Sequence, residues 1–450
     1  MPYIIVTSRS PYSYDRVRGK INKRMNIGGV AIVLNDLISR EGGTWVCWGD
    51  GTADHEFQEE DNGKFRISRI LLTIQERRGF YDEYSNSTLW PLFHYFREKI
   101  QHDQKYFKIY QKVNELFAAA IEKSIRNKDE VIWIHDYQLS LVPGFLKEKG
   151  VTNPIIFTWH IPWVSDEFYS ILPERELLLK SISSADSITF HTKEYRTNFR
   201  DSYEKIIGDP KSVDRKLHYY PLGIDYKAYE DIERFRKIPL AMQNTKIIFS
   251  IDRLDYTKGL IARVKAIESL LRNNPELSQK FMYLMIVTPS RTNVGQYMDL
   301  KNELEMNIGR INGEYGRIGW YPITYIYRKV SQKTLINYYK WADIALITPL
   351  IDGLNLVCKE FIAASNKGLL ILSEFAGSAE DLNGAVKVNP NSIENLSSTL
   401  FSALSMPESE IMDRLNSLKE KVRRRDIQWW ARKVTETIKR KESNVRNAGN

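Results

Sequence analysis

Short apolar runs alternate with helix-like segments along almost the whole chain, and this alternation limits the possible folds more than any other feature. Strands that are apolar on both faces are typical of parallel sheets covered by helices on either side. Strands are therefore expected at residues 3–7, 44–48, 131–134, 155–159, 187–190 and 217–220, and then at 246–251, 281–287, 323–326, 344–348 and 368–372. Helices fill the intervals, so the pattern predicts an α/β protein.

The length of the chain indicates two domains. It has 450 residues, of which 42% are hydrophobic and 27% charged, and this is enough for two cores of roughly 200 residues each. The segment 226–244 is charged and weakly periodic, which is typical of a joint. We expect two Rossmann-like domains, residues 1–235 and 236–424, with parallel sheets that face each other across a cleft.

Several classes of protein are disfavoured by composition. No apolar run approaches the roughly 20 residues that a membrane span needs, and the first residues lack the basic flank of a signal peptide. A cytoplasmic protein with no membrane partner is therefore expected. The cysteines, Cys47 and Cys358, each lie in an apolar segment, which indicates two reduced, buried thiols and no disulfide framework.

The net charge of +9 is concentrated in two places. One is the basic tail, which reads as a solvated helix face and contains Lys421, Arg423, Arg424, Arg425, Lys439, Arg440 and Lys441. The other is a basic loop from Arg9 to Arg24, just before the Gly28-Gly29 turn that begins an apolar helix, where a phosphate would be held. No nucleic-acid-binding signature accompanies the charge, so a nucleic-acid partner is not expected.

Two segments of the second half share one layout, a strand followed by a polar loop and a helix start. Residues 248–260 place Arg253 and Lys258 after the first strand, and 344–360 place the loop Asp352-Gly-Leu-Asn355 after the second. Ligands of open α/β sheets bind at such strand ends, and cations there suit a pyrophosphate. Two such edges facing each other would form a nucleotide-sugar site. Dinucleotide, P-loop and zinc signatures are absent from the sequence.

Further short motifs fall in a characteristic order. They are Thr7-Ser-Arg9, Gly28-Gly29, the segment from Tyr81 to Pro91, Trp133-Ile-His-Asp-Tyr137, His160-Ile-Pro162, Pro221-Leu-Gly-Ile224, Arg253-Leu-Asp-Tyr-Thr-Lys258, Pro289-Ser-Arg291, Gly309-Arg-Ile-Asn-Gly313 and the segment from Asp352 to Glu360. In this order, up to about residue 395, the chain resembles trehalose-6-phosphate synthases of glycosyltransferase family 20. These are retaining enzymes of the GT-B fold.

The resemblance implies a donor site for a nucleotide glucose. Arg253 and Lys258 would contact the diphosphate, and preorganised cations of this kind act most strongly as negative charge develops on the leaving group. Asp352 would hold the sugar ring, and Glu360 would accept hydrogen bonds from the ribose. The remaining residues expected to bind the donor are Gly28, Gly29, Gly353, Leu354, Asn355, Leu356 and Val357.

The resemblance also implies an acceptor site for a sugar phosphate. Arg9, Tyr81 and Arg291 would grip the phosphate, because a dianion favours charge-assisted donors from several directions. Trp90 and Asp136 would hold the ring. His191 departs from the family pattern, in which Gln is common at this position, while Arg196 is retained.

His160 would contact the transferred glucose, which makes Arg253, Lys258, His160 and Asp352 the expected catalytic set. No carboxylate nucleophile is implied, so the two-carboxylate geometry of glycosidases does not apply. The implied route is front-face displacement, in which the departing phosphate oxygen takes the proton of the acceptor hydroxyl. No cofactor and no essential metal are expected.

The implied reaction joins glucose from a nucleotide glucose, such as UDP-glucose, to glucose 6-phosphate, giving trehalose 6-phosphate. A separate phosphatase would then remove the phosphate. Two alternatives stay open: the same fold with another phosphorylated acceptor, such as glycerol 3-phosphate or a cyclitol phosphate, and a regulatory module without catalysis. A final helix at about 425–445 is expected to return to the first domain, although its aromatic residues also suit packing between copies in a homo-oligomer.

Overall fold

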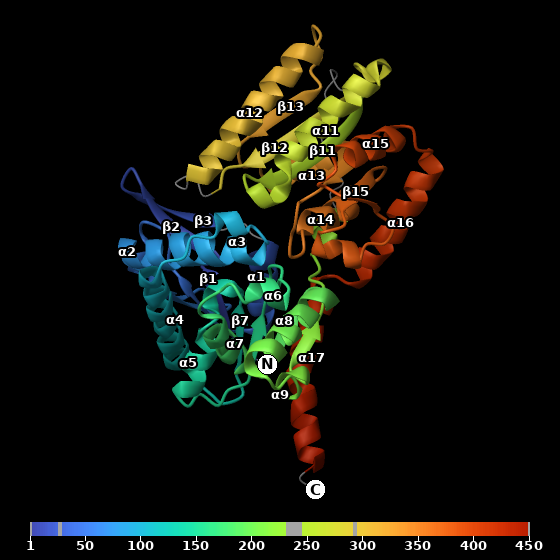
Figure 1. Ribbon diagram of the computed structural model, residues 1–450. Coiled ribbons are helices and arrows are strands. Elements are labelled where there is room, and N and C mark those ends of the chain that lie inside the picture. The colour runs from blue at the N-terminus through green and yellow to red at the C-terminus, as the bar shows by residue number, and fades with distance from the viewer. Residues whose placement is uncertain (1, 26–28, 231–244, 291–294, 449–450) are drawn as a thin grey trace. The chain divides into compact units, whose positions relative to one another are not determined.

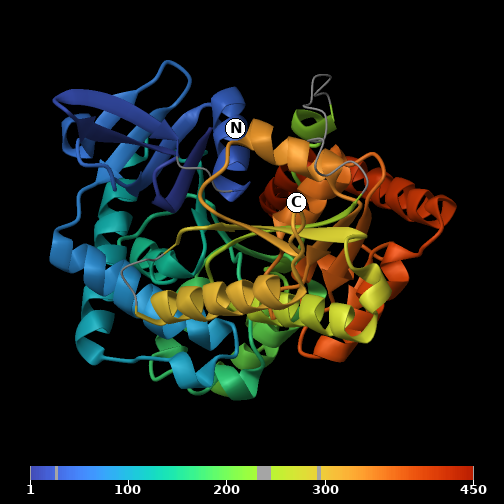
Figure 2. The ribbon, with the colours of Figure 1, turned by 90° about the horizontal axis from the view of Figure 1, so that it is seen from above.

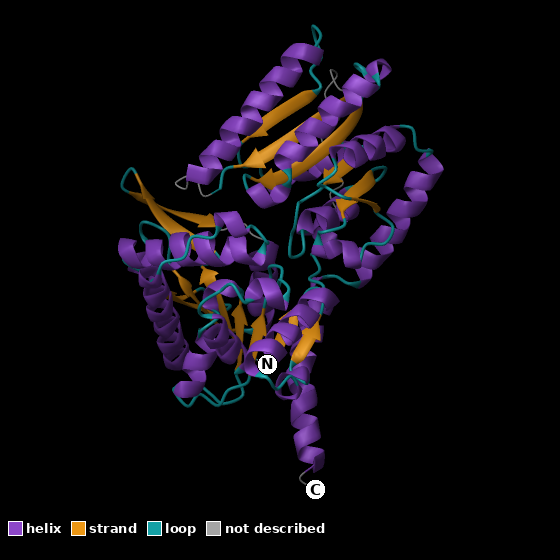
Figure 3. Cartoon of the chain, viewed as in Figure 1, coloured by secondary structure: helices purple, strands orange, loops and turns teal. Residues whose placement is uncertain are grey.

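The computed structural model describes residues 2–25, 29–230, 245–290 and 295–448, and its contacts divide the chain into two compact units. Unit 1 comprises 1–222 and 428–450, and unit 2 comprises 223–427. The expected joint near residue 235 lies among residues outside the described part, whereas the contacts divide the chain between Leu222 and Gly223. Figure 3 shows the strands of each unit with helices around them.

The sheet of unit 1 has eight strands in the order β10-β9-β8-β7-β1-β4-β6-β5. All neighbours are parallel except β5 and β6. The bounds are β1 Tyr3–Arg9, β4 Gly43–Trp48, β5 Glu59–Asp61, β6 Arg66–Ile70, β7 Val131–His135, β8 Ile155–Thr158, β9 Ser187–Phe190 and β10 Leu217–Tyr219. The six strands expected in this half are confirmed, with ends that differ by at most two residues.

The helices of unit 1 surround this sheet (Figure 1). Their bounds are α1 Gly29–Glu41, η1 Asp54–Phe57, α2 Ile74–Arg77, η2 Arg78–Leu89, α3 Trp90–Phe93, η3 Arg97–Lys99, α4 Gln104–Ser124, η4 Tyr137–Leu139, α5 Val142–Glu148, α6 Asp166–Tyr169, α7 Arg175–Ser183, α8 Lys193–Ile207, α9 Lys211–Asp214 and, in red in the figure, α17 Ile427–Ala448. The helix η2 is a π-helix of 12 residues, a rare form that often occurs at functional sites.

The segment expected to be a basic loop is a β-hairpin, so that prediction was wrong. Strands β2 (Tyr12–Val17) and β3 (Lys20–Met25) pair antiparallel around a two-residue turn at Arg18 and Gly19, both with positive φ. Arg16 and Arg24 form ion pairs with carboxylates of Glu56 and Asp15. The hairpin has no continuous apolar face, and this is why the strand pattern was not visible in the sequence.

The sheet of unit 2 is entirely parallel, in the order β13-β12-β11-β14-β15-β16. Its strands are β11 Lys246–Arg253, β12 Phe281–Thr288, β13 Ile323–Tyr327, β14 Ile344–Ile347, β15 Leu369–Ser373 and β16 Val386–Val388. The five strands expected in this half are confirmed, again with ends within two residues. The short edge strand β16 was not predicted.

Two apolar layers cover the sheet of unit 2. Successive strand residues point to opposite faces, so that Phe249 packs in one layer and Ile248 in the other. Helices α11 (Leu260–Asn273), α12 (Gly295–Tyr315) and α15 (Ile393–Leu404) cover one face. In Figure 2, α11 and α12 lie on the same side of the strands. The other face carries α10 Lys227–Glu230, α13 Gln332–Trp341, α14 Leu356–Ala364 and most of α16 Glu408–Arg424.

The last helix, α17, packs on unit 1. Trp430 lies with its ring 5.2 Å from the ring of Trp133 on β7, and the Thr437 hydroxyl donates to Ser187 on β9 over 2.7 Å. In the described part of the chain, no helix has the length and apolarity that crossing a bilayer requires. Cys47 and Cys358 are buried free thiols, as expected; burial raises the pKa of each to about 12.

Candidate active site

The two loops that the sequence singled out in unit 2 follow adjacent strands of a single sheet. Arg253 is the last residue of β11, which pairs in parallel with β14, the strand before the loop at 352–355. The loops therefore meet at one carboxyl edge, and the expectation of two edges facing each other was wrong for this pair. Lys258 ends a short 3₁₀ helix, η6 (Tyr256–Lys258), directly before α11.

The closest contact between these loops joins Lys258 to Asp352. The Lys258 Nζ lies 2.5 Å from Asp352 Oδ2, and the amide of Asn355 donates to the same oxygen over 3.2 Å. Lys258 is only 8% exposed, so water screens the attraction between the two charges less than in a surface ion pair. Arg253, by contrast, is exposed at the strand end. The edge thus presents one buried and one exposed cation.

The loop from Gly353 to Asn355 leads into α14. Asn355 has φ 71°, a left-handed conformation that is uncommon outside glycine, and its side-chain oxygen accepts from the backbone N–H of Cys358. Leu356 and Val357 are the first two residues of the helix. Their N–H groups have no acceptor within the helix because they precede its first hydrogen-bonded turn, which suits an anionic ligand.

Glu360 lies one turn into α14 and is held by phenol groups. The Tyr339 hydroxyl donates to Glu360 Oε2 over 2.8 Å, and Tyr229 also hydrogen-bonds the same carboxylate. Burial raises the pKa of the Glu360 carboxyl. The two tyrosines orient a carboxylate that retains lone pairs for a further donor, and neither tyrosine was predicted from the sequence.

Arg263 on α11 is a second residue that the sequence analysis missed. Its fully buried guanidinium contacts Asp252 Oδ2 over 2.5 Å, the Thr348 hydroxyl over 3.0 Å and the carbonyl of Lys258 over 2.6 Å. The planar guanidinium thus connects the ends of β11 and β14 to the loop that carries Lys258. One signal was available, since Arg263 interrupts the apolar face of the helix next to Val264 and Leu260.

In unit 1, the structure brings Arg9 and Tyr81 together. The Arg9 guanidinium lies 4.7 Å from the centre of the Tyr81 ring, which itself packs against Trp48. Tyr81 belongs to the π-helix η2, whose Asn86 donates to the Tyr81 carbonyl and accepts from the Tyr137 hydroxyl. A cation above an aromatic ring with a phenol hydroxyl nearby is able to bind an anion.

Trp90 and Asp136 are both neighbours of Tyr137, Trp90 in space and Asp136 along the chain. Trp90 is buried, with its ring 6.0 Å from the Tyr137 ring and 4.0 Å from the His94 ring. Asp136 follows β7 with φ 73° and ψ 168°, an unfavourable conformation for a residue with a side chain. The backbone N–H of His160 donates to Asp136 Oδ1 over 3.2 Å, and the Asp136 N–H donates to the Thr158 carbonyl.

His160 follows β8, with both ring nitrogens bonded to other histidines. Its Nε2 lies 3.0 Å from His135 Nδ1, and its Nδ1 lies 2.9 Å from His191 Nε2. Burial and the adjacent imidazoles hold the pKa of His160 well below its usual value. The expected contact of His160 with a sugar stays a prediction, and the engaged nitrogens constrain how it is made.

Gly28 and Arg291, two of the predicted ligand residues, fall outside the described residues. Gly29 is the first residue of α1, as the sequence indicated. Among the described side chains, no group of three or more His, Cys, Asp or Glu is arranged to hold a metal ion.

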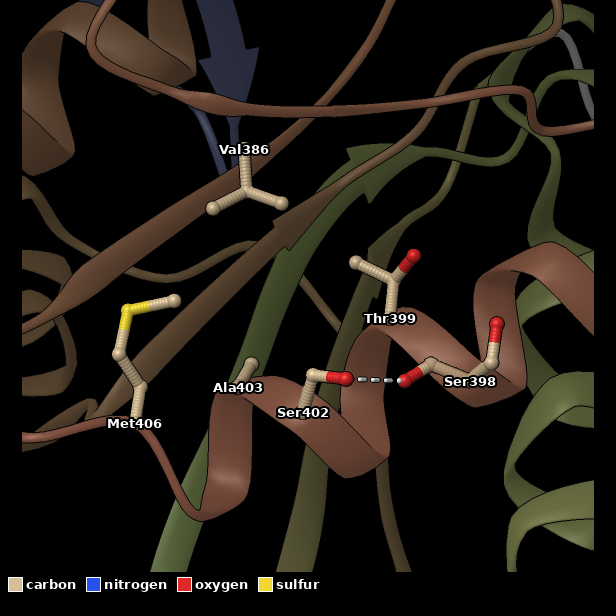
Figure 4. Close-up of a pocket in the computed structure, with 6 residues that line it drawn as sticks. All are labelled: Val386, Ser398, Thr399, Ser402, Ala403 and Met406. Carbon is tan, nitrogen blue, oxygen red and sulfur yellow. Dashed lines mark hydrogen bonds between the residues drawn. The ribbon is translucent and has the colours of Figure 1, made fainter.

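A cavity of about 220 Å³ lies elsewhere on unit 2 (Figure 4). Ser398, Thr399, Ser402 and Ala403 of α15 line it together with Val386 and Met406. In Figure 4 the Ser402 hydroxyl bonds back to the carbonyl of Ser398, within its own helix. None of the predicted site residues lines this cavity.

Comparisons with known proteins agree over nearly the whole chain. Residues 2–440 match glycosyltransferase family 20. A bifunctional trehalose-6-phosphate synthase/phosphatase of Thermoproteus tenax is 36% identical over 96% of this chain, which spans 62% of that relative's length.

Two solved structures are similar in fold as well as in sequence. One, described as trehalose-6-phosphate from E. coli bound with UDP-2-fluoro glucose, has a TM-score of 0.88 and 31% identity, covering 97% of this chain and 99% of its own. The other is a UDP-forming alpha,alpha-trehalose-phosphate synthase of Burkholderia xenovorans in complex with glucose-6-phosphate, with a TM-score of 0.86, 30% identity and coverage of 97% and 100%. The chain, with its two Rossmann-like units, has the GT-B fold and belongs to glycosyltransferase family 20.

Proposed function

We propose that this protein is a trehalose-6-phosphate synthase, which transfers glucose from a nucleotide glucose to glucose 6-phosphate and retains the anomeric configuration. The observation that carries the proposal is the Lys258–Asp352 pair at the carboxyl edge of unit 2, with Nζ and Oδ2 2.5 Å apart. A cation and a carboxylate on loops after adjacent parallel strands suit a ligand that has both a phosphate and sugar hydroxyls.

The donor is proposed to bind unit 2. Arg253 and Lys258 would neutralise the diphosphate, most strongly as the bond to glucose breaks. The N–H groups of Leu356 and Val357 would add the N-terminal end of α14 to this anion site. The other donor residues are proposed to be Asp352, Gly353, Leu354 and Asn355 for the sugar, Glu360 for the ribose, and Gly28 and Gly29. UDP-glucose is the proposed donor, because a family relative binds a fluorinated form of it.

The acceptor is proposed to be glucose 6-phosphate, held mainly by residues of unit 1. Arg9 and Tyr81 would bind the phosphate together with Arg291, while Trp90 and Asp136 would hold the sugar ring. The contact between Arg9 and the Tyr81 ring supports this proposal, since it preorients both groups. The Burkholderia relative in complex with glucose-6-phosphate supports the same acceptor.

The proposed chemistry is a front-face displacement. The acceptor hydroxyl attacks the anomeric carbon on the face from which the diphosphate departs, and the departing phosphate oxygen takes the hydroxyl proton. The protein would then contribute positioning and charge stabilisation. Because both ring nitrogens of His160 bond to other histidines, we assign this residue no proton transfer.

We also propose that the reaction needs no metal ion and that a separate phosphatase acts on the product. Turnover measured with and without EDTA tests the first point. Unchanged turnover is expected, and a loss of activity that Mg²⁺ restores would contradict it. The Thermoproteus relative, by its description, carries synthase and phosphatase in one chain.

Mass spectrometry of reaction mixtures tests the proposed function directly. Each nucleotide glucose is offered with glucose 6-phosphate, glycerol 3-phosphate or free glucose. A disaccharide phosphate is expected from UDP-glucose and glucose 6-phosphate, and trehalase should cleave it after dephosphorylation. Product from glycerol 3-phosphate alone would overturn the acceptor assignment. The absence of product from every mixture would overturn the proposal that the protein is an enzyme of this kind.

A pair of arginine variants tests the donor clamp. Arg253→Ala is expected to lower kcat by about 10²–10³, the usual cost of losing one preorganised donor to developing charge. Arg272→Ala removes an exposed cation on α11 of the same unit and serves as the control. Equal activity of the two folded variants would reject the clamp.

A further inference from the structure

Three histidines at the carboxyl edge of unit 1 form one hydrogen-bonded array. His135 ends β7, His160 follows β8 and His191 follows β9, and these strands are neighbours in the sheet. The Nδ1–Nε2 distances are 3.0 Å from His135 to His160 and 2.9 Å from His160 to His191. The His191 Nδ1 then lies 3.1 Å from the carbonyl of Tyr220. The array thus ends on a backbone acceptor.

This end point determines where every proton of the neutral array lies. A carbonyl only accepts, so His191 Nδ1 must carry the proton and its Nε2 must accept. His160 therefore donates from Nδ1 and accepts at Nε2, and His135 donates from Nδ1. Each ring is in the Nδ1–H tautomer. His135 Nε2 is left as a buried acceptor without a hydrogen-bond partner among the described atoms.

The array is buried and surrounded by aromatic rings. His135 and His191 are 2% and 3% exposed. The Trp133 ring lies 5.1 Å from the His135 ring, and the Trp430 ring of α17 lies 6.5 Å and 6.4 Å from those of His160 and His191. Desolvation lowers the pKa of His135 to about 3 and depresses that of His160. Burial therefore favours the neutral forms of His135 and His160.

The array connects to Asp136 through the backbone of His160. The His160 N–H donates to Asp136 Oδ1 over 3.2 Å, and Asp136 has the unfavourable φ of 73°. A residue in such a conformation keeps its geometry only when its surroundings hold it. With its ring bonded on both sides, His160 has little freedom to rotate or shift. Its N–H consequently stays directed at the carboxylate.

We propose that His191 is a positioning residue for the acceptor sugar: by bonding both Tyr220 and His160, it holds the His160 backbone and hence the carboxylate of Asp136. This inference rests on the proposed function, in which Asp136 binds the ring of glucose 6-phosphate. His191 itself touches no substrate. Its effect should therefore appear in acceptor binding and leave donor binding unchanged.

Nuclear magnetic resonance of the native protein tests the array without any variant. With ¹⁵N-labelled histidine, long-range ¹H–¹⁵N spectra distinguish the Nδ1–H tautomer from the more common Nε2–H tautomer. Three neutral Nδ1–H rings are expected at pH 7. An Nε2–H tautomer or a charged ring at His160 would overturn the proposed array, and this result does not depend on the activity of the protein.

Substitutions of His191 test the positioning role. His191→Leu removes both hydrogen bonds and is expected to raise the Kd for glucose 6-phosphate about tenfold, the cost of loosening one hydrogen bond to a charged group. The Kd for UDP-glucose should not change. His191→Gln should recover most of the loss, because its amide can donate to Tyr220 and accept from His160. His218→Gln, one strand further along, is the control and should bind as the native protein does.

The outcomes separate the two proposals. If the native protein does not bind glucose 6-phosphate, the proposed function fails. The positioning role then fails too, even if the magnetic resonance spectra show the three expected Nδ1–H tautomers. If the native protein binds it and folded His191→Leu binds it equally well, only the positioning role is overturned. If His191→Leu does not fold, His191→Ser takes its place, because its short side chain cannot reach both Tyr220 and His160. A Kd of His191→Ser for glucose 6-phosphate equal to that of His191→Gln would overturn the positioning role, and a loss of donor affinity instead would contradict it as well.

Discussion

Single buried residues organise the carboxyl edge of unit 2, where the donor is proposed to bind. Arg263 ties Asp252, Thr348 and the Lys258 carbonyl together, and Tyr339 orients Glu360. Neither group is placed to touch a ligand itself. Each limits the freedom of a residue that is proposed to bind the donor, so less entropy would be lost on binding.

The clearest test at this scale is Tyr339→Phe, which removes one hydroxyl and keeps the ring. The Glu360 carboxylate loses a 2.8 Å hydrogen bond, so the Kd for the nucleoside diphosphate is expected to rise about tenfold. Calorimetric titration measures this. Tyr338→Phe changes the neighbouring, half-buried ring and should leave the Kd unchanged; identical affinities for the two variants would argue against the orienting role.

The histidine array predicts how stability depends on pH. The native protein keeps His135 neutral down to about pH 3, whereas the unfolded chain protonates histidine near pH 6.5. Below pH 6.5 the unfolded state therefore binds more protons, and the free energy of unfolding falls as the pH falls, by up to about 1.4 kcal/mol per pH unit for each such histidine. Urea titrations between pH 7 and 4 measure the slope. The slope of His135→Gln should be shallower, and equal slopes would exclude the effect.

Among the elements, the start of α11 depends on one glycine. Gly259 has φ 66°, and a Cβ added there would lie 2.4 Å from the Thr348 carbonyl oxygen. Gly259→Ala is expected to cost at least about 2 kcal/mol of stability, through the left-handed conformation and the clash. Thermal unfolding measures this. The matched control is Gly309→Ala on α12, where a Cβ meets nothing within 4 Å and helix propensity predicts a gain of about 0.5–1 kcal/mol. If Gly259→Ala left the free energy of unfolding unchanged, the segment at Thr348 must move aside at little cost.

The hairpin β2–β3 shows how distant contacts make an element. The hydroxyls of Tyr12 and Tyr14 both donate to Glu60 Oε1, over 2.9 Å and 2.8 Å, and Glu60 pairs with the fully buried side chain of Arg69 over 2.9 Å. The Lys23 ammonium lies 3.3 Å from the centre of the Tyr12 ring. Glu60 and Arg69 are roughly fifty residues away from these tyrosines in the sequence, which is why the local pattern of charges indicated only a loop.

At the scale of the whole molecule, the last helix belongs to a different unit from the segment that precedes it in the chain. Helix α17 directly follows α16 of unit 2 in the sequence, yet from Gln428 onward it belongs to unit 1. Near the division, the Ile427 N–H donates to the Ile224 carbonyl. A Cβ added at Gly223 would lie 2.3 Å from the Arg425 carbonyl oxygen. The two segments that lead out of unit 2 are therefore in close contact where they leave it.

Trp430→Ala tests the assignment of α17. Trp430 is fully buried against Trp133, and its loss should cost about 3–5 kcal/mol. Hydrogen exchange should accelerate in β7, β8 and β9 of unit 1 and stay unchanged in β11, β12 and β14 of unit 2. Trp429→Ala removes the half-buried neighbour and should have a much smaller effect. Faster exchange spread over both units would contradict the assignment.

From the sequence alone, we predicted the α/β class, eleven strands and the loops that carry Arg253, Lys258 and Asp352. These follow from local properties, because runs of apolar residues have few alternatives to a buried strand and glycine with polar residues ends them. The resemblance led to glycosyltransferase family 20, and the comparisons confirm it.

Tertiary structure decided which of these loops meet and which buried groups orient them. The adjacency of β11 and β14, the fork of Arg263, the tyrosines on Glu360 and the array of His135, His160 and His191 all join residues from separate strands and helices. The sequence determined where each strand ends and which side chain follows it. Only the packing of strands side by side decided which of those side chains share a proton or a hydrogen bond, because these contacts depend on strand order, which no local pattern encodes.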